Sequence, residues 1–252
     1  MNRNEFRKIF KSIGPVVLPV VHVLDHDQTE SNVQVVMREG ARGVFLINHD
    51  FGPEQMLPII RKIRRLYPSL WLGLNFLGVN GLGAFPMLAQ LQNEGIVIDA
   101  YWADNSAVDE NKSIDDQPGA KAITDARAEY EWQGMYFGGT AFKKQRIVSE
   151  EKYEYAAKVA AGFMDVVTTS GVATGEAADV SKIRAFRQGA QDAPIAVASG
   201  VTTGNVKDYA KDVDCFLVAT GINIPGDFYN IEPERLRRLM FITKEFGLSG
   251  QS

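Results

Sequence analysis

Small hydroxyl residues followed by glycine end two apolar stretches near the carboxyl terminus of this chain. The pairs are Ser199-Gly200 and Thr220-Gly221. If the two stretches form adjacent parallel strands, their turns bring several backbone N–H groups together, and such a nest binds phosphate. Ser170-Gly171 ends an earlier apolar stretch and is expected to form a third wall of the same pocket. The predicted phosphate-binding residues are therefore Ser170, Gly171, Ser199, Gly200, Thr220 and Gly221.

Residues that could transfer protons or contact the reacting end of a ligand follow other apolar stretches. Histidine titrates near neutrality, and burial can raise the pKa of a carboxyl group. Lys143 could bind an anion, or form a Schiff base if desolvation lowered its pKa. The predicted catalytic residues are Asp104, His49, Lys143 and Asn75, and His22 is a further candidate for proton transfer.

A metal site is an alternative interpretation of the histidines. All three, His22, His26 and His49, lie in the first fifth of the chain, and with Asp25 they are of the right kinds for zinc or a related ion. Their spacing matches no specific motif. We therefore predict no cofactor and no metal ligands, and a divalent metal stays open as an alternative. Structural interpretations also stay open, because glycines end strands at any sharp turn and lysine pairs such as Lys143-Lys144 are common on surfaces.

Eight apolar stretches of strand length alternate with helical patterns and would position these residues. The expected strands are 15–23, 43–48, 70–77, 96–103, 135–139, 165–170, 194–198 and 215–219. The main expected helices are 29–39, 53–66, 85–93, 120–132, 149–163, 178–188 and 233–246, with Thr29 as a possible N-cap. The strands are apolar throughout rather than alternating, as in a parallel sheet buried on both faces.

The order, count and length favour one architecture. A chain of 252 residues is close to the roughly 250 of a (β/α)8 barrel. We therefore predict a single TIM-barrel domain over residues 1–252. In such barrels the active site lies at the carboxyl ends of the strands, and the loops after strands seven and eight commonly bind phosphate. Because alternate strand residues point opposite ways, Asp104 and Asn105 cannot both face the mouth, and we favour Asp104.

Residues 1–13 are predicted to form a short N-terminal helix. Phe6, Ile9, Phe10 and Ile13 give one apolar stripe with basic residues opposite. We expect this helix to cover the bottom of the barrel, and a membrane-surface helix is the alternative. Pro19 counts against a central strand at 15–23. The polar loop 106–119 could be a lid, an interface or a disordered segment.

Composition narrows the class of protein. Hydrophobic residues make up 45% and charged residues 23%, as in ordinary globular domains. The net charge of -4 gives no electrostatic reason to expect nucleic acid or an anionic membrane. One cysteine excludes a disulfide framework, and no apolar stretch approaches about 18 residues. We expect a cytoplasmic protein with a phosphorylated small-molecule ligand, no nucleic-acid or membrane partner, and a possible homo-oligomeric state.

The last third of the chain resembles a known family. The segment DVVTTSGVATGEAADVSKIRAFRQGAQDAPIAVASGVTTGNVKDYAKDVDCFLVATGI is similar to the BtpA/SgcQ family. The matching residues are Ser170, Gly171, Thr174, Gly175, Ser199, Gly200, Asn205, Val206, Thr220 and Gly221. The resemblance implies a TIM barrel of the phosphate-binding type. One namesake of the family is associated with photosystem I biogenesis, and others look like enzymes of unassigned substrate.

The sequence thus leads to two hypotheses about function. In the first, the protein is an enzyme acting on a sugar phosphate or nucleotide, with lyase, isomerase or phosphoribosyl-transfer chemistry. In the second, it is a non-catalytic assembly factor of the BtpA type that uses the barrel as a scaffold. Stabilisation and turnover by a phosphorylated metabolite would distinguish the enzyme from the scaffold.

Overall fold

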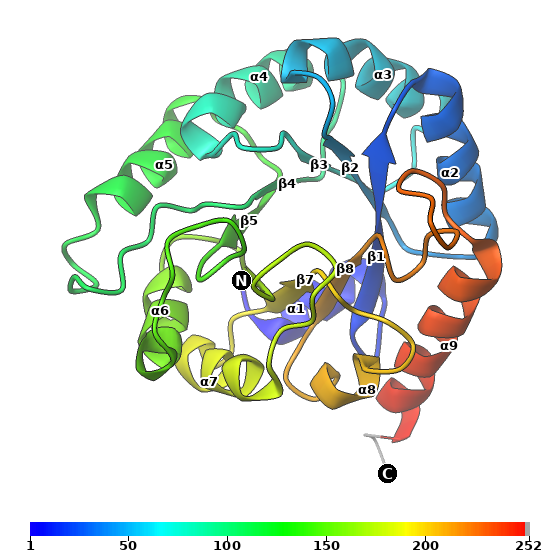
Figure 1. The fold of residues 1–252 in the computed structure, drawn as a ribbon. Coiled ribbons are helices and arrows are strands. Elements are labelled where there is room, and N and C mark those ends of the chain that lie inside the picture. Colours follow the sequence, from blue (N-terminus) through cyan, green and yellow to red (C-terminus); the bar gives the residue numbers. More distant parts are fainter. Residues whose placement is uncertain (250–252) are drawn as a thin grey trace.

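Eight parallel strands close into one barrel in the computed structural model, in which residues 1–249 are described (Figure 1). Each strand pairs with the next, and β1 pairs with β8, so the sheet has no free edge. The strands are β1 (Val16–Val23), β2 (Val44–Asn48), β3 (Leu72–Asn75), β4 (Ala100–Ala103), β5 (Met135–Gly139), β6 (Val166–Ser170), β7 (Ile195–Ala198) and β8 (Cys215–Val218). The predicted (β/α)8 architecture is confirmed.

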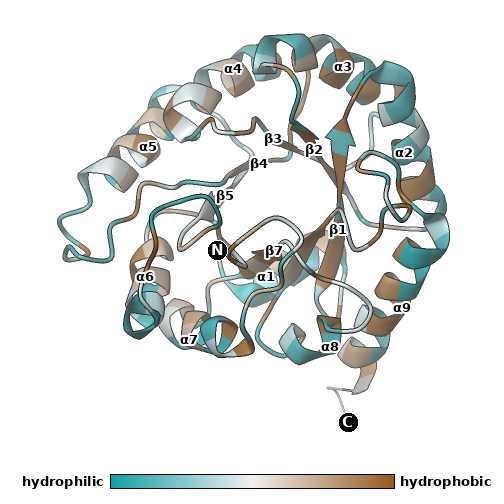
Figure 2. Cartoon of the chain, in the orientation of Figure 1, coloured by the Kyte–Doolittle hydropathy of each residue, from teal (hydrophilic) through white to brown (hydrophobic). Residues whose placement is uncertain are grey.

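Helices α2 to α9 form the outer ring, and Figure 2 shows hydrophobic residues on the strands and hydrophilic ones on the outer helix faces. The helices are α1 (Arg3–Phe10), α2 (His26–Arg38), α3 (Pro53–Leu66), α4 (Gly81–Asn93), α5 (Pro118–Glu129), η1 (Glu150–Lys152), α6 (Tyr153–Ala160), α7 (Val180–Ala190), α8 (Val206–Tyr209) and α9 (Pro233–Ser249). No helix among residues 1–249 is long and apolar enough to cross a membrane.

The barrel interior is filled by large side chains from alternate strand positions. Phe45, Trp102 and Phe137 form one buried cluster inside the barrel, and the Phe45 ring lies edge-on to both of the others. Gly73 on β3 makes room for this cluster, because a Cβ there would lie 2.3 Å from the Phe45 ring. The lower barrel is therefore packed core, and polar chemistry is restricted to the carboxyl ends of the strands.

Helix α1 covers the bottom of the barrel, as predicted from its apolar stripe. Phe6 and Phe10 are buried, and their rings contact Phe137 and Trp71 at centroid distances of 6.2 and 5.0 Å. The predicted stripe was too wide, since Ile9 and Ile13 are 45% and 42% exposed. A helix lying over a barrel end buries only the side chains that point along the barrel axis.

A buried carboxylate fastens α1 to the barrel. Asp214 precedes β8, and its side chain is fully buried. Its Oδ1 accepts from Arg3 at 2.8 Å and from Arg7 at 3.3 Å, both on α1. Its Oδ2 accepts from Arg187 of α7 at 2.7 Å and from the backbone N–H of Ile195 at 3.1 Å. Three cations and one backbone group thus depend on a single carboxylate.

Two helices begin three or four residues earlier than predicted, because side-chain caps lie further upstream. Helix α2 begins at His26, since Asp25 accepts a hydrogen bond from the Gln28 N–H at 2.8 Å, so Thr29 lies inside the helix and is not its N-cap. Helix α4 begins at Gly81, four residues earlier than expected, because Asn80 caps it. Part of the predicted glycine loop is therefore helical.

Smaller differences concern α3 and β1. Near the end of α3 the apolar Leu66 is 48% exposed, whereas the basic Arg64 is buried and donates to Asp99 at 2.7 Å. Pro19 lies inside β1 opposite Val218, so the proline does not interrupt this central strand.

The long loop before α5 is folded against the barrel rim. The Ser106 hydroxyl donates to the Gly139 carbonyl at 2.8 Å, and the Gln117 side chain donates to the Asp109 carbonyl at 2.8 Å. Glu110 is buried and pairs with Arg146. None of the loop residues 106–117 lines the cavity described below, so the loop does not cover it as a lid.

Candidate active site

A cavity at the carboxyl ends of the strands gathers most of the predicted site residues. Figure 1 shows the loops after β5, β6 and β7 lying across this end of the barrel. The polar and glycine residues that line the cavity are His22, His49, Asp104, Lys143, Lys144, Thr174, Gly175, Ser199, Gly200, Thr220 and Gly221. Apolar side chains such as Val20, Ile47, Trp102 and Leu217 form its floor and walls.

The alternation of β4 directs Asp104 into this cavity. Trp102 and Asp104 line it, whereas Asn105 lines a separate surface pocket. Asn75 of β3 is buried and its Nδ2 donates to Asp104 Oδ1 at 3.0 Å. Burial raises the pKa of Asp104, although the Asn75 hydrogen bond and Lys143 oppose this shift. Asp104 is thus suited to carry a proton closer to neutral pH than an exposed aspartate.

His22 and His49 lie edge to face in the cavity, with ring centroids 4.6 Å apart. His22 Nδ1 lies 2.7 Å from the carbonyl oxygen of Phe228. Because a carbonyl can only accept, Nδ1 carries the proton of the neutral ring and Nε2 keeps its lone pair. Burial and the neighbouring His49 lower the pKa of His22 to about 4, so the ring is neutral at pH 7.

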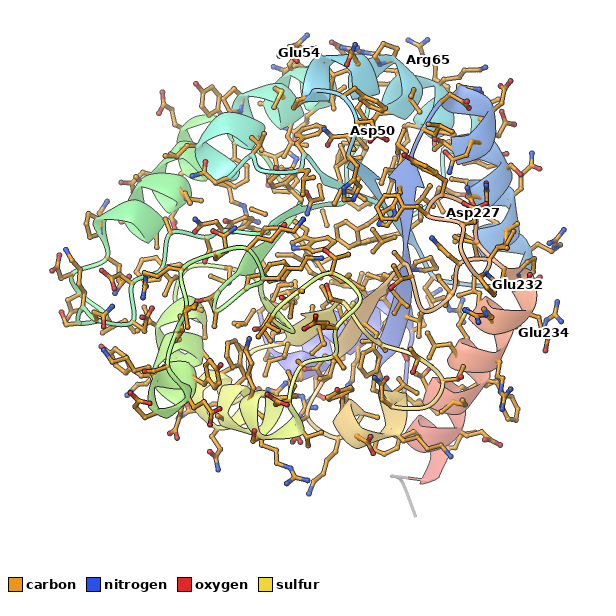
Figure 3. All side chains as sticks on the ribbon, viewed as in Figure 1. Asp50, Glu54, Arg65, Asp227, Glu232 and Glu234 are labelled. Carbon is orange, nitrogen blue, oxygen red and sulfur yellow. The ribbon has the colours of Figure 1, made fainter. Side chains whose placement is uncertain are left out.

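The loop between β8 and α9 holds this histidine pair in place. The Phe228 ring lies 3.9 Å from the His22 ring, centroid to centroid. The Tyr229 hydroxyl donates to Asp50, which Figure 3 labels in the loop after β2, and the Tyr229 carbonyl accepts from Gln28 at 2.8 Å. Phe228 and Tyr229 thus both contact side chains of the protein.

The pKa of His22 predicts a pH dependence of stability. The folded chain leaves His22 unprotonated above about pH 4, whereas an unfolded histidine titrates near its ordinary 6.5. Between these values the unfolded state binds more protons, so the free energy of unfolding decreases as pH falls, by at most about 1.4 kcal/mol per pH unit. Urea unfolding of wild type and His22→Gln at pH 7, 5.5 and 4.5 measures this contribution. The difference in free energy of unfolding between wild type and His22→Gln should decrease as pH falls. A difference that stays constant with pH would contradict the lowered pKa of His22.

Lys143 and Ser199 meet at the side of the cavity formed by β7 and β8. Lys143 Nζ donates to Ser199 Oγ at 2.8 Å. Burial lowers the pKa of Lys143, and Asp104 partly restores it. The ammonium group is thus held close to the Ser199-Gly200 turn. Its positive charge would attract any anion bound there.

The two glycine turns also present unused backbone donors. Among residues 1–249, the N–H groups of Gly200, Val201, Thr220 and Gly221 donate to no protein acceptor, and all four residues line the cavity. Partly enclosed N–H groups without acceptors are the usual elements of a phosphate nest. Four of the six residues predicted to bind phosphate therefore lie together: Ser199, Gly200, Thr220 and Gly221.

Three of the seven non-glycine residues with left-handed φ angles among residues 1–249 lie in the loops at this site. Ala141, Lys144 and Ser199 have left-handed φ angles of 44°, 57° and 69°, which are unfavourable for residues other than glycine. Such strain persists only where the surroundings enforce it, and it is commonly found at functional sites. All three residues belong to the loops that border the Lys143–Ser199 contact.

Ser170 and Gly171 do not line the cavity, contrary to the sequence prediction. The Ser170 hydroxyl accepts from the Lys143 N–H at 2.8 Å and donates to the Gly171 carbonyl at 2.8 Å, so it is fully used within the protein. Gly171 allows close packing of its own loop, since a Cβ there would lie 2.3 Å from the Glu176 carbonyl oxygen. In this structure Ser170 binds the Lys143 backbone, and Gly171 packs within its own loop.

Two residues near the site were not singled out from the sequence. Trp102 lines the cavity, and its Nε1 is buried without a partner among residues 1–249. Its position two residues before Asp104 on β4 could have indicated the same face. Lys182 of α7 donates to the carbonyls of Ala141 and Ser170 at 2.6 and 2.8 Å, which joins the loops after β5 and β6. No periodic signal distinguishes this buried lysine from a surface one.

The four residues of the metal alternative do not come together. Only His22 and His49 share the cavity. Asp25 caps α2, and His26 contacts Asp27 at 3.0 Å and Lys62 at 2.8 Å. The described part of the chain contains no group of three or more histidine, cysteine or acidic residues placed to hold a metal ion.

Solved structures with the same fold include several barrels of low sequence identity. A phosphoribosyl anthranilate isomerase from Thermus thermophilus is 11% identical, with a TM-score of 0.60 over 94% of this chain and 100% of that one. A structure described as native KDPGal is 12% identical, with a TM-score of 0.60 over 92% and 96% of the two chains. A structure from Aquifex aeolicus is 14% identical, with a TM-score of 0.63 over 97% and 98%. At such identities these likenesses show the fold alone.

Sequence comparison identifies a relative and a family. An uncharacterized protein of Thermococcus kodakarensis is 36% identical over 85 residues, which are 33% of this chain and 32% of that protein. The match thus spans about a third of the relative's length. The sequence model of the BtpA family matches residues 56–245, which include β3 to β8 and most of α9. The protein therefore belongs to the BtpA family.

Proposed function

We propose that this protein is an enzyme that acts on a phosphorylated small molecule at the carboxyl end of its barrel. The observation that carries the proposal is the nest after β7 and β8, where four backbone N–H groups have no acceptor among residues 1–249 and Lys143 contacts Ser199. A phosphate there would accept from the backbone and from a partly buried ammonium group, and both interactions are favourable for a dianion. The fold shared with a phosphoribosyl anthranilate isomerase is consistent with this assignment.

The opposite wall of the cavity offers groups for proton transfer. Asp104, with its raised pKa, would act as general acid or base, and the unprotonated Nε2 of neutral His22 would accept a hydrogen bond from the ligand. Lyase, isomerase and phosphoribosyl-transfer reactions all move protons beside a phosphorylated carbon skeleton, so they share these requirements. Lys143 is engaged at the nest, which favours anion binding over Schiff-base formation.

Two unpaired groups in the cavity indicate which polar groups the ligand carries between the phosphate nest and Asp104. Trp102 Nε1 and His49 Nε2 are buried without partners among residues 1–249. Unsatisfied buried groups are costly, so a bound ligand should supply a hydrogen-bond acceptor to the indole N–H and a polar group to the imidazole. A chain or ring with hydroxyl groups, as in a sugar phosphate or a nucleotide ribose, meets both needs.

Thermal unfolding in the presence of matched ligand pairs tests this function. Each phosphorylated metabolite is compared with its dephosphorylated form, and hits are then assayed for turnover. At a ligand concentration 1,000 times the Kd, stabilisation should reach about 4 kcal/mol for a phosphorylated ligand and remain near zero for its partner. Stabilisation by neither form, together with copurification of a protein partner, would favour the scaffold hypothesis instead.

A further inference from the structure

A second groove lies outside the nest and shares part of its wall. Gly175, Gly200, Thr220 and Gly221 line both the inner cavity and this outer groove. Two of these residues are glycines of the nest itself, so little more than backbone separates the two spaces. On the far side the groove is bordered by Arg235 and Arg238 of α9.

The charge of the outer groove is uncompensated. Among residues 1–249, nine arginines form ion pairs with acidic side chains, whereas the surface residues Arg42, Arg65 and Arg184 form none. Within residues 1–249, Arg235 and Arg238 pair with no carboxylate, and no acidic residue lines the groove. Arg235 donates only to the Asn223 carbonyl, at 3.2 Å. Nearby Glu234 pairs with Arg237 at 2.6 Å and lies at the outer edge of α9 in Figure 3.

The position of these arginines does not benefit the helix that carries them. Helix α9 begins at Pro233, so Arg235 lies in its first turn. Positive charge is unfavourable there, because the helix dipole is positive at the amino end. Both side chains are exposed and Arg235 does not stabilise the helix start, so their place on the groove wall beside the nest is the observation that suits them to an anionic ligand.

We propose that the ligand carries a second anionic group, which binds Arg235 and Arg238 in the outer groove while the first occupies the nest. Thr203 also lines this groove, and its hydroxyl would add a donor. The ligand class is then a diphosphate or bisphosphate ester rather than a monophosphate. This inference rests on the proposed function, since it places the first anion at the nest.

Binding of inorganic phosphate, pyrophosphate and tripolyphosphate, measured by calorimetry at fixed ionic strength, tests the inference. Wild type should bind one of the longer anions roughly tenfold or more tightly than phosphate, because each added charge-assisted contact strengthens binding. The double variant Arg235→Gln/Arg238→Gln should lose this preference and keep its affinity for phosphate. The matched control is Arg65→Gln/Arg184→Gln, which removes two exposed arginines elsewhere and should keep the preference.

The outcomes separate this inference from the function on which it rests. If wild type binds phosphate but shows no preference for the longer anions, the outer site is refuted and the nest stands. The same holds if the Arg235/Arg238 variant keeps the preference, or if the control variant loses it equally. If wild type binds none of the three anions, the nest itself is refuted, and the outer site is refuted with it.

Discussion

Replacing Asp214 by alanine is expected to lower the free energy of unfolding by about 3 to 5 kcal/mol, as is usual when one partner of a buried ion pair is removed. The carboxylate is fully buried and holds Arg3, Arg7 and Arg187 together with the Ile195 N–H. Without it, three guanidinium groups lose their counter-ion, and a backbone donor at the start of β7 loses its acceptor. Urea unfolding followed by circular dichroism measures the change.

The matched control for Asp214 is an acidic residue in an exposed ion pair. Asp116 lies 3.3 Å from Lys112, and both side chains are well exposed. Because exposed pairs contribute little, Asp116→Ala should change stability by less than about 1 kcal/mol. An equally small effect of Asp214→Ala would contradict this prediction. It would mean that the ion pairs of Asp214 do not stabilise the contact between α1 and the barrel.

Replacing Lys143 by methionine is expected to weaken phosphate binding roughly 10- to 100-fold, the loss typical of a hydrogen bond to a charged group. The ammonium group lies 2.8 Å from Ser199 and is the only lysine nitrogen bonded at the nest among residues 1–249. Stability should be unchanged or slightly higher, because burial disfavours the charged form of this lysine. Calorimetry with inorganic phosphate and thermal unfolding without ligand measure the two effects.

Lys158→Met serves as the control for Lys143, since Lys158 is an exposed lysine on α6. It should leave phosphate affinity unchanged. Equal affinities of wild type and Lys143→Met, in a variant that unfolds at the wild-type temperature, would exclude Lys143 from the anion site. Loss of affinity in both variants would indicate a general effect of charge rather than a contact at the nest.

The fold could be predicted from the sequence because a buried parallel strand requires an unbroken apolar stretch. The predicted strand 135–139 and helix 53–66 agree with β5 and α3 to the residue. Turn chemistry was also informative: Ser199-Gly200 and Thr220-Gly221 end adjacent strands, as the β7–β8 register shows. Where boundaries differed, as at Asp25 and Asn80, a side-chain cap extended the helix beyond its apolar pattern.

The composition of the cavity was less predictable, because it depends on contacts between distant loops. Ser170 looked like a ligand-facing hydroxyl, but its oxygen is occupied by the Lys143 N–H, 27 residues away in the sequence. Trp102 lies in an apolar strand, and only the closed barrel shows that its indole nitrogen has no partner among residues 1–249. Strand periodicity predicts which face a residue occupies, but not which hydrogen bonds remain free there.

The contact between α1 and Asp214 also limits when this chain can complete its fold during synthesis. Arg3 and Asp214 are separated by 211 positions, so at about 5 to 20 residues per second the helix emerges roughly 10 to 40 seconds before its acceptor. During that time β1 also lacks β8, its neighbour on one side. The nascent barrel therefore has an unpaired strand edge at β1 until the eighth strand leaves the ribosome. In a cell, this interval is when the chain would most depend on chaperones.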